Sequence, residues 1–210
     1  MKKENVKKEK EEKLNVEEKS NVKKLKGEKE EKIDVKKQQA SYKGMYYYIR
    51  QAWKKPDMKV LRERMIGWRD SPVVVRVEKP LRLDRARALG YKDKIGFSVA
   101  RIRLKRGGHK RTRPNKGRKG KRLHTRKNLM MNYREIAEQR VARKFTNLEV
   151  LNSYLIGKDG IHYFYEVILV DPQRPEIKND KTINWITKPV NKRRTFRGMT
   201  SAGKKARGLR

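Results

Sequence analysis

Apolar residues recur at two different spacings along the chain, and these spacings predict where helices and strands lie. In residues 45–68 they fall three or four positions apart on either side of Pro56, which predicts two helices because proline interrupts a helix. Residues 73–77 (VVVRV) are rich in β-branched side chains and predict a strand. Residues 96–106 (GFSVARIRLKR) alternate, which predicts a strand whose one face changes from apolar to cationic towards its end.

The aromatic residues of the first helical region allow two interpretations. Tyr48 and Trp53 precede the proline and Trp68 follows it, and arginines lie close to all three in the sequence. Such a cluster could stack on nucleic-acid bases. Aromatic side chains at helical spacing more often belong to a core or an interface, and we favour that interpretation here.

Two further helices are expected after the first strand. Asp84 is placed to N-cap a short helix, DRARAL, that ends at Gly90. Residues 131–145 (MNYREIAEQRVARKF) place their apolar side chains on one helical stripe with charges opposite. This pattern predicts a longer amphipathic helix.

The most regular strand pattern lies between residues 148 and 171. Residues 148–157 (LEVLNSYLIG) and 161–171 (IHYFYEVILVD) are joined by a Lys-Asp-Gly turn, which predicts a β-hairpin. Proline, asparagine and aspartate then indicate a surface loop at residues 172–180. Residues 191–210 contain almost no apolar side chains, so we expect an extended basic C-terminal arm. The order of elements predicts an α+β fold, with a small, mostly antiparallel sheet and packed helices.

The most unbalanced charge in the chain lies between Lys94 and Arg134. The stretch has no Asp or Glu, and fourteen Lys or Arg lie between Arg101 and Lys127. Like charges at this spacing repel one another, so the predicted loop at residues 105–128 needs a polyanion to neutralise it. The whole chain has a net charge of +36 and no cysteine. Nucleic acid is therefore the first partner to expect, ahead of an anionic membrane or an acidic protein.

Residues 1–44 have a different composition, with fifteen Lys, no Arg, ten acidic residues and isolated apolar positions. The apolar spacing fits neither a heptad nor a strand, which favours a charged leader that is disordered or transiently helical. A second contact arm for RNA or a partner is the alternative. We divide the chain into this leader, a body at residues 45–190 that contains the basic loop, and a C-terminal extension at residues 191–210.

Other classes of protein find little support in the sequence. The longest apolar runs are too short to span a bilayer, so we expect no membrane partner and a cytoplasmic location. The nucleotide-binding and hydrolase motifs GxxxxGK[ST], GxSxG and HExxH are absent, and the three histidines are scattered, so we expect no catalytic, cofactor, metal or small-molecule site. Two alternatives remain open: a free RNA chaperone or nucleic-acid-compacting protein, and an RNA-processing enzyme whose carboxylates converge in space.

Phosphate binding needs cations on a backbone that can bend along a groove. The two basic segments have many Lys and Arg residues and also contain glycines that allow such bending. Arginine can fork onto two phosphate oxygens or stack on a base, whereas lysine acts as a point charge. Shape is the expected basis of recognition, because A-form RNA hides its base edges. The candidate RNA-binding residues are Arg101, Arg103, Lys105, Arg106, Gly107, Gly108, His109, Lys110, Arg111, Arg113, Lys116, Arg118, Lys119, Lys121, Arg122, Arg126, Lys127, Lys192, Arg193, Arg194, Arg197, Lys204, Lys205 and Arg207.

Several long blocks of the chain resemble one known family. The blocks WRDSPVVVRVEKPLRLDRARALGYKDKIGFSVARIRLKRGGHKRTRP, LEVLNSYLIGKDGIHYFYEVILVDP, NWITKP and FRGMTSAGKKARGL occur in the order found in the large-subunit ribosomal protein fifteen family of eukaryotes and archaea. The resemblance covers residues 45–210. It implies a ferredoxin-like elaboration of the α+β core, embedded in large-subunit ribosomal RNA, with neighbouring large-subunit ribosomal proteins as partners. It implies nothing about the leader.

Overall fold

The structure is a computed structural model that describes residues 44–110 and 126–209, and the chain divides into two units between Trp53 and Lys54. The described residues of the first unit are Gly44 and α2 (Met45–Lys54) as far as Trp53, and α2 has no buried residue. The first complete helix of the second unit is α3 (Met58–Asp70). The break between α2 and α3 confirms the two helices that the proline predicted.

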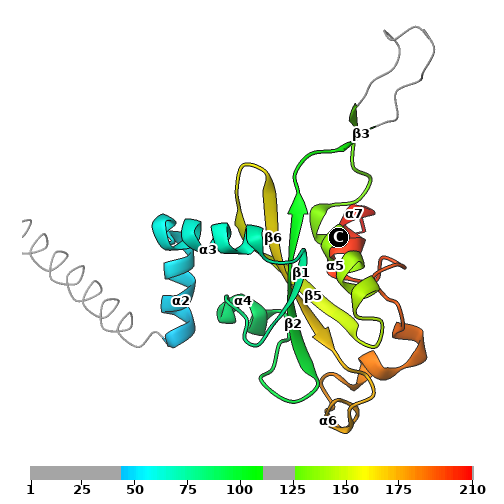
Figure 1. The fold of residues 1–210 in the computed structure, drawn as a ribbon. Coiled ribbons are helices and arrows are strands. Elements are labelled where there is room, and N and C mark those ends of the chain that lie inside the picture. Colours follow the sequence, from blue (N-terminus) through cyan, green and yellow to red (C-terminus); the bar gives the residue numbers. More distant parts are fainter. Residues whose placement is uncertain (1–43, 111–125, 210) are drawn as a thin grey trace, which may run out of the picture. The chain divides into compact units, whose positions relative to one another are not determined.

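The remaining elements of the second unit form a four-stranded antiparallel sheet, a two-stranded ribbon and several helices. The sheet has the order β1-β2-β6-β5, which confirms the α+β class (Figure 1). In chain order the elements are β1 (Val74–Val77), α4 (Leu83–Ala88), β2 (Phe97–Lys105), β3 (His109–Lys110), β4 (Arg126–Lys127), α5 (Tyr133–Lys144), β5 (Glu149–Lys158), β6 (His162–Val170), α6 (Pro175–Lys178), η2 (Asn184–Thr187), η3 (Pro189–Asn191) and α7 (Ser201–Ala206).

One face of the sheet packs against α5. Ile102 and Leu104 of β2 are at most 1% exposed and share a core cluster with Val141 of α5 and Leu169 of β6. Because neighbouring side chains on a strand point to opposite faces, the alternation in β2 places every second residue in this cluster. The predicted apolar stripe of α5 thus lies on the sheet.

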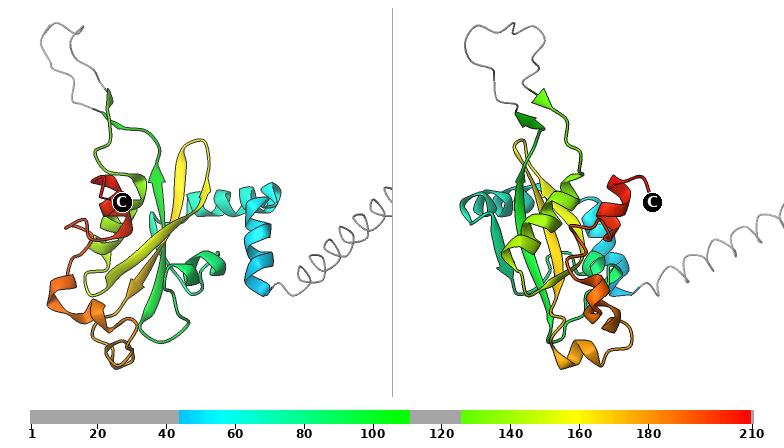
Figure 2. Two further views of the ribbon diagram at one scale, coloured as in Figure 1. Left: turned by 180° about the vertical axis from the view of Figure 1, so that it is seen from behind. Right: turned by 90° about the vertical axis from the view of Figure 1, so that its right-hand side faces the viewer.

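The other face of the sheet packs against α3 and α4. Trp68 of α3 meets Phe164 of β6 edge to face, with 5.3 Å between ring centroids. Leu61 and Met65 of the same helix are also buried, so the core interpretation holds for α3. It does not hold for Tyr48 of α2, which is 57% exposed. Figures 1 and 2 show the sheet between α3 and α4 on one side and α5 and α7 on the other.

The strand order differs from the ferredoxin-like arrangement that the resemblance implied. In a split β-α-β unit a third strand lies between the two strands that a helix connects. Here β1 and β2 flank α4 in the chain but pair directly and antiparallel, with Val75 opposite Arg101. The connection through α4 therefore joins two adjacent antiparallel strands and does not cross over a third strand. All neighbouring strands in the sheet are antiparallel.

The start of α4 also differs from the prediction. Arg82 occupies the N-cap position without a side-chain hydrogen bond, and Asp84 lies within the first turn of the helix. The Asp84 side chain is buried and forms an ion pair with Arg82 at 3.4 Å. It is therefore turned towards the protein interior and its carboxylate does not cap the helix. The predicted end of this helix at Gly90 is confirmed, because Gly90 has a φ of 99° that favours glycine.

The hairpin of β5 and β6 is confirmed, and the Asp159 carboxylate orders its turn by accepting the backbone N–H groups of Ile161 and His162. Within the predicted surface loop at residues 172–180, α6 forms and Ile177 is buried. The 3-10 helices η2 and η3 follow this loop, and Ile186 of η2 is buried. Across the described residues, no helix is long and apolar enough to cross a membrane.

Candidate nucleic-acid interface

The basic loop leaves the sheet at the end of β2 and returns just before α5. Its root is held by the Tyr133 hydroxyl of α5, which accepts the Gly107 N–H at 2.9 Å and donates to the Gly107 carbonyl at 3.3 Å. Gly107 has a φ of 100°, a conformation that favours glycine. A Cβ on Gly108 would overlap the carbonyl oxygen of Lys127, so the two sides of the root approach each other where only glycine fits. Beyond this point β3 and β4 pair as a short antiparallel ribbon.

The surface of α5 beside this root is cationic because both acids of the helix are buried. Glu135 is 7% exposed and Glu138 is fully buried. Arg140, Arg143 and Lys144 are exposed on the same helix. The exposed surface of α5 therefore carries positive charge with no exposed carboxylate of the helix to offset it.

The C-terminal segment packs against α5 from the other end of the sequence. The Asn132 side chain caps α5 through the Glu135 N–H at 2.8 Å and donates to the Ala202 carbonyl of α7 at 2.9 Å. Ala202 is 1% exposed, and the Thr200 side chain caps α7. This differs from the expected extended arm, because the small side chains of residues 200–203 allow the segment to fold back closely onto the body.

Two segments without acidic residues thus meet at α5. The first runs from Lys94 to Arg134 and leads into the helix, and the second is residues 181–210, which contain ten Lys or Arg. They are far apart in the sequence and contact each other through Asn132 and Ala202. The fold therefore brings the described end of the first segment, at Asn132, against the second segment beside α5.

Three arginines predicted to bind RNA also hold the sheet and its hairpin together. The Arg101 guanidinium lies 4.9 Å from the centre of the Trp68 ring. Arg103 donates to the Arg69 carbonyl at the end of α3. Arg106 donates to the Asp159 carbonyl at 2.9 Å and lies over the Tyr163 ring at 5.2 Å. Their contacts within the protein account for part of their hydrogen-bonding capacity.

Arg194 is a correction to the predicted set. Its side chain is buried, and its Nη1 donates to the carbonyls of Val150 at 2.8 Å and Leu151 at 2.9 Å. The guanidinium also lies 4.9 Å from the Trp185 ring centre. Burial lowers the pKa of Arg194. This arginine ties the C-terminal segment to β5 and has no open face for a phosphate.

The other predicted cations and His109 fall into three groups. Seven lie outside the described residues: Arg111, Arg113, Lys116, Arg118, Lys119, Lys121 and Arg122. His109, Lys110 and Arg126 belong to the β3–β4 ribbon. Eight cations are exposed, most of them around α5, the loop root and α7: Lys105, Lys127, Lys192, Arg193, Arg197, Lys204, Lys205 and Arg207.

The sequence prediction did not include the exposed cations of α5. Arg140 and Arg143 belong to a helix whose net charge looks moderate in the sequence, because two glutamates accompany its basic residues. The available signal was the helical spacing, since Glu138 lies one position from Ala137 and three from Val141, on the buried stripe. When the acidic residues of a helix lie on its buried face, the exposed face carries only the basic residues.

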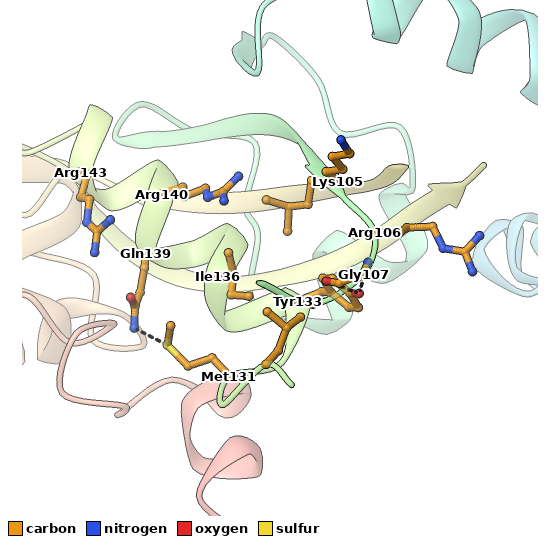
Figure 3. Close-up of a pocket in the computed structure, with 12 residues that line it drawn as sticks. Lys105, Arg106, Gly107, Met131, Tyr133, Ile136, Gln139, Arg140 and Arg143 are labelled. Atoms are coloured by element: carbon orange, nitrogen blue, oxygen red, sulfur yellow. Dashed lines mark hydrogen bonds between the residues drawn. The ribbon is translucent and has the colours of Figure 1, made fainter. Parts of the chain in front are cut away.

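A cavity of about 730 Å³ lies between the loop root and α5. Its lining combines apolar, aromatic and cationic side chains, without an acidic one. In Figure 3 the side chain of Ile136 lies between Met131 on one side and Arg140 and Lys105 on the other, and Arg106 points away from them. The lining residues are Leu104, Lys105, Arg106, Gly107, Gly108, Leu129, Met131, Tyr133, Ile136, Gln139, Arg140 and Arg143.

Two carboxylates, one on either side of the sheet, are buried within the body. Burial raises the pKa of Glu138, and hydrogen bonds from Ser153 and Thr200 partly offset this. Burial likewise raises the pKa of Glu166, which accepts the Tyr154 hydroxyl at 2.5 Å. The hydrogen-bond partners of both carboxylates are groups of the protein itself. The described residues contain no cluster of three or more acidic or histidine side chains that could hold a metal ion.

Comparison with known protein families shows which family this chain belongs to. A model of the family described as Ribosomal L15 matches residues 44–210, which include the whole of the sheet, the loop and the C-terminal segment. The chain belongs to the Ribosomal L15 family of eukaryotes and archaea. It is therefore a structural protein of the large ribosomal subunit.

Membership in the Ribosomal L15 family agrees with the resemblance seen in the sequence blocks. The match begins at residue 44, close to the predicted boundary between leader and body. The family is one of structural ribosome components and implies a ribosomal location. Residues 1–43 lie outside both the match and the described residues.

Proposed function

We propose that this protein binds large-subunit ribosomal RNA through one continuous cationic surface and so stabilises the subunit during its assembly. The surface is formed by the exposed side of α5, the root of the basic loop, and the C-terminal segment around α7. The observation that carries the proposal is the meeting of the two acid-free segments at α5, whose own acids are buried.

Such a surface favours RNA because phosphates neutralise cations that otherwise repel one another. Each neutralised phosphate releases counterions, so affinity falls steeply as salt rises. Arg140, Arg143 and Lys204 are exposed and lie outside the core, so their charges are available to a ligand. The surface has a fixed shape in the described residues, which suits recognition of RNA by shape rather than by base sequence.

The basic loop extends the same proposal beyond the described residues. Its root is ordered by Tyr133 and closed by the approach of Gly108 to Lys127. This anchoring sets where the chain leaves and re-enters the body. We propose that the loop follows the phosphate backbone outward from the α5 surface, and that neighbouring large-subunit proteins border it.

A binding experiment with matched charge reversals tests the proposal. In one variant Arg140, Arg143 and Lys204 are replaced by Glu. In the control Lys59, Arg64 and Arg85, which are exposed on α3 and α4 across the sheet, are replaced by Glu. Affinity for a large-subunit ribosomal RNA fragment is measured by fluorescence anisotropy over a range of salt concentrations.

The first variant should reduce the slope of log affinity against log salt by about 0.9 for each lost phosphate contact, or about 2.7 in total. The control should leave the slope unchanged, because its charges lie on the other side of the sheet. Equal losses in both variants would contradict the proposal, since they would indicate binding by net charge alone.

A further inference from the structure

The cavity beside α5 has a composition that a phosphate-binding surface does not require. A surface that only neutralises phosphates needs exposed cations. This cavity adds an apolar floor formed by Leu129, Met131 and Ile136, together with the ring of Tyr133. Its volume of about 730 Å³ lies within the about 300–1,000 Å³ typical of small-molecule sites.

We infer that this cavity holds an unstacked base of RNA, with the adjoining phosphate on the cationic rim. The inference rests on the proposed RNA binding and specifies where a base enters the protein. A base is flat and apolar on its faces and polar at its edge, so it suits an apolar floor with polar groups beside it. Lys105 and Arg140 are lining residues on the side of Ile136 away from Met131 (Figure 3), and among the described residues neither side chain has an ion-pair or hydrogen-bond partner.

Gln139 provides a polar group suited to the edge of a base. Its Nε2 donates to the Met131 Sδ at 3.4 Å (Figure 3), and a thioether sulfur is a weak acceptor. A base carbonyl or ring nitrogen is a stronger acceptor and would take this hydrogen bond in place of the sulfur. The amide can therefore turn to a ligand at little cost.

The Tyr133 ring is fixed before any ligand arrives. Its hydroxyl is held by Gly107, and its ring packs against Tyr163 with 4.7 Å between centroids. A preformed aromatic wall lowers the entropy that binding must overcome. The cavity shares Arg140 and Arg143 with the proposed RNA surface and no acid lines it, so an anionic ligand fits it better than an apolar protein segment, and the aromatic wall with its apolar floor favours a base over an acidic peptide.

A pair of adjacent methionines gives a matched test. Met131 lines the cavity and Met130, which is 88% exposed, does not. Met131→Glu and Met130→Glu change the net charge equally and at neighbouring positions. Only the first places a carboxylate in the cavity. The probes are two RNA hairpins of equal length, one fully paired and one with a single bulged adenosine.

The full-length protein should bind the bulged hairpin about tenfold more tightly than the paired one, as expected for one stacked base. Met131→Glu should reduce this preference to less than about twofold, and Met130→Glu should keep it. Gln139→Ala provides a second variant if Met131→Glu unfolds, as judged by circular dichroism, and it should weaken the preference as well.

Equal binding of both hairpins by the wild type would overturn the inference. A preference that survives both cavity variants would overturn it too. Neither result would affect the proposed function, which depends on the salt slope measured with the large-subunit ribosomal RNA fragment. In intact large subunits, ultraviolet crosslinks should place a nucleotide on residues 129–140; a protein crosslink there without nucleotide adducts would contradict the inference.

Discussion

Arg194 is buried against β5, whereas Arg140 and Arg143 are exposed and are proposed to face RNA, and replacing Arg194 tests this distinction. Arg194→Met keeps an unbranched apolar side chain and removes the guanidinium. Two hydrogen bonds to β5 carbonyls, at 2.8 and 2.9 Å, are lost in a buried environment. Removing one partner from a buried charged network costs about 3–5 kcal/mol, and bonds to charged groups contribute about 1.5–3 kcal/mol each. The guanidinium contact with the Trp185 ring is lost, but the methionine can pack on the ring in its place, so we expect the free energy of unfolding to fall by about 3 kcal/mol.

Urea unfolding followed by circular dichroism measures this loss. With an m-value of about 2 kcal/mol per molar urea, the unfolding midpoint should fall by about 1.5 M. Lys205→Met is the control, because Lys205 is exposed on α7 and its replacement should change stability by less than about 0.5 kcal/mol.

RNA affinity should respond in the opposite way to stability: Lys205→Met should lose more affinity than Arg194→Met. Under conditions where it is folded, Arg194→Met should keep its affinity for the ribosomal RNA fragment within about twofold of the wild type. Lys205→Met removes one possible phosphate contact, which at about 0.1 M salt corresponds to about an eightfold loss. A midpoint shift below about 0.3 M for Arg194→Met, or an affinity loss larger than that of Lys205→Met, would refute the reasoning.

Three further predictions concern the loop root, the buried acid and the link to α7. Gly108→Ala should weaken RNA binding severalfold in anisotropy without lowering the unfolding midpoint of the body, whereas Gly160→Ala, which has open space around its Cβ, should change neither. For Glu138, burial raises the folded-state pKa, so the folded protein binds the proton more tightly and its stability falls as pH rises above about 4. Glu138→Gln should therefore gain stability relative to the wild type between about pH 4 and 7 in urea melts, and a constant difference would contradict this. Asn132→Ala should cost about 1 kcal/mol as a lost N-cap and also reduce RNA affinity by loosening α7, whereas Asp57→Ala should cost similar stability with affinity unchanged.

Periodicity predicted most of the fold because the core is built from regular alternation. The alternation of residues 96–106 and the Asp-Gly turn before β6 were enough to place β2 and the hairpin, since each segment buries one face. Strand order was not predictable in this way. Direct pairing of β1 with β2 depends on how α4 returns the chain, which no local pattern encodes.

The candidate site was predicted less completely, because charge alone does not distinguish a surface cation from a buried one. Arg194 lies in a run of basic residues, and only its contacts with β5 show that it is structural. Arg140 was not among the predicted residues, because two glutamates in the same helix make the charge of the helix look moderate, although its side chain is exposed. Residues of the loop between β3 and β4 lie outside the described residues, so their role remains a prediction.

Sedimentation of the protein with large ribosomal subunits tests the central claim most directly. Tagged wild-type protein and the Arg140→Glu, Arg143→Glu, Lys204→Glu variant are expressed in cells, and extracts are separated on sucrose gradients before and after a moderate salt wash. The wild type should remain with the large subunit through the wash, and the variant should stay near the top of the gradient as folded, free protein. A variant that sediments with the large subunit and resists the wash as the wild type does would contradict RNA binding through the α5 surface.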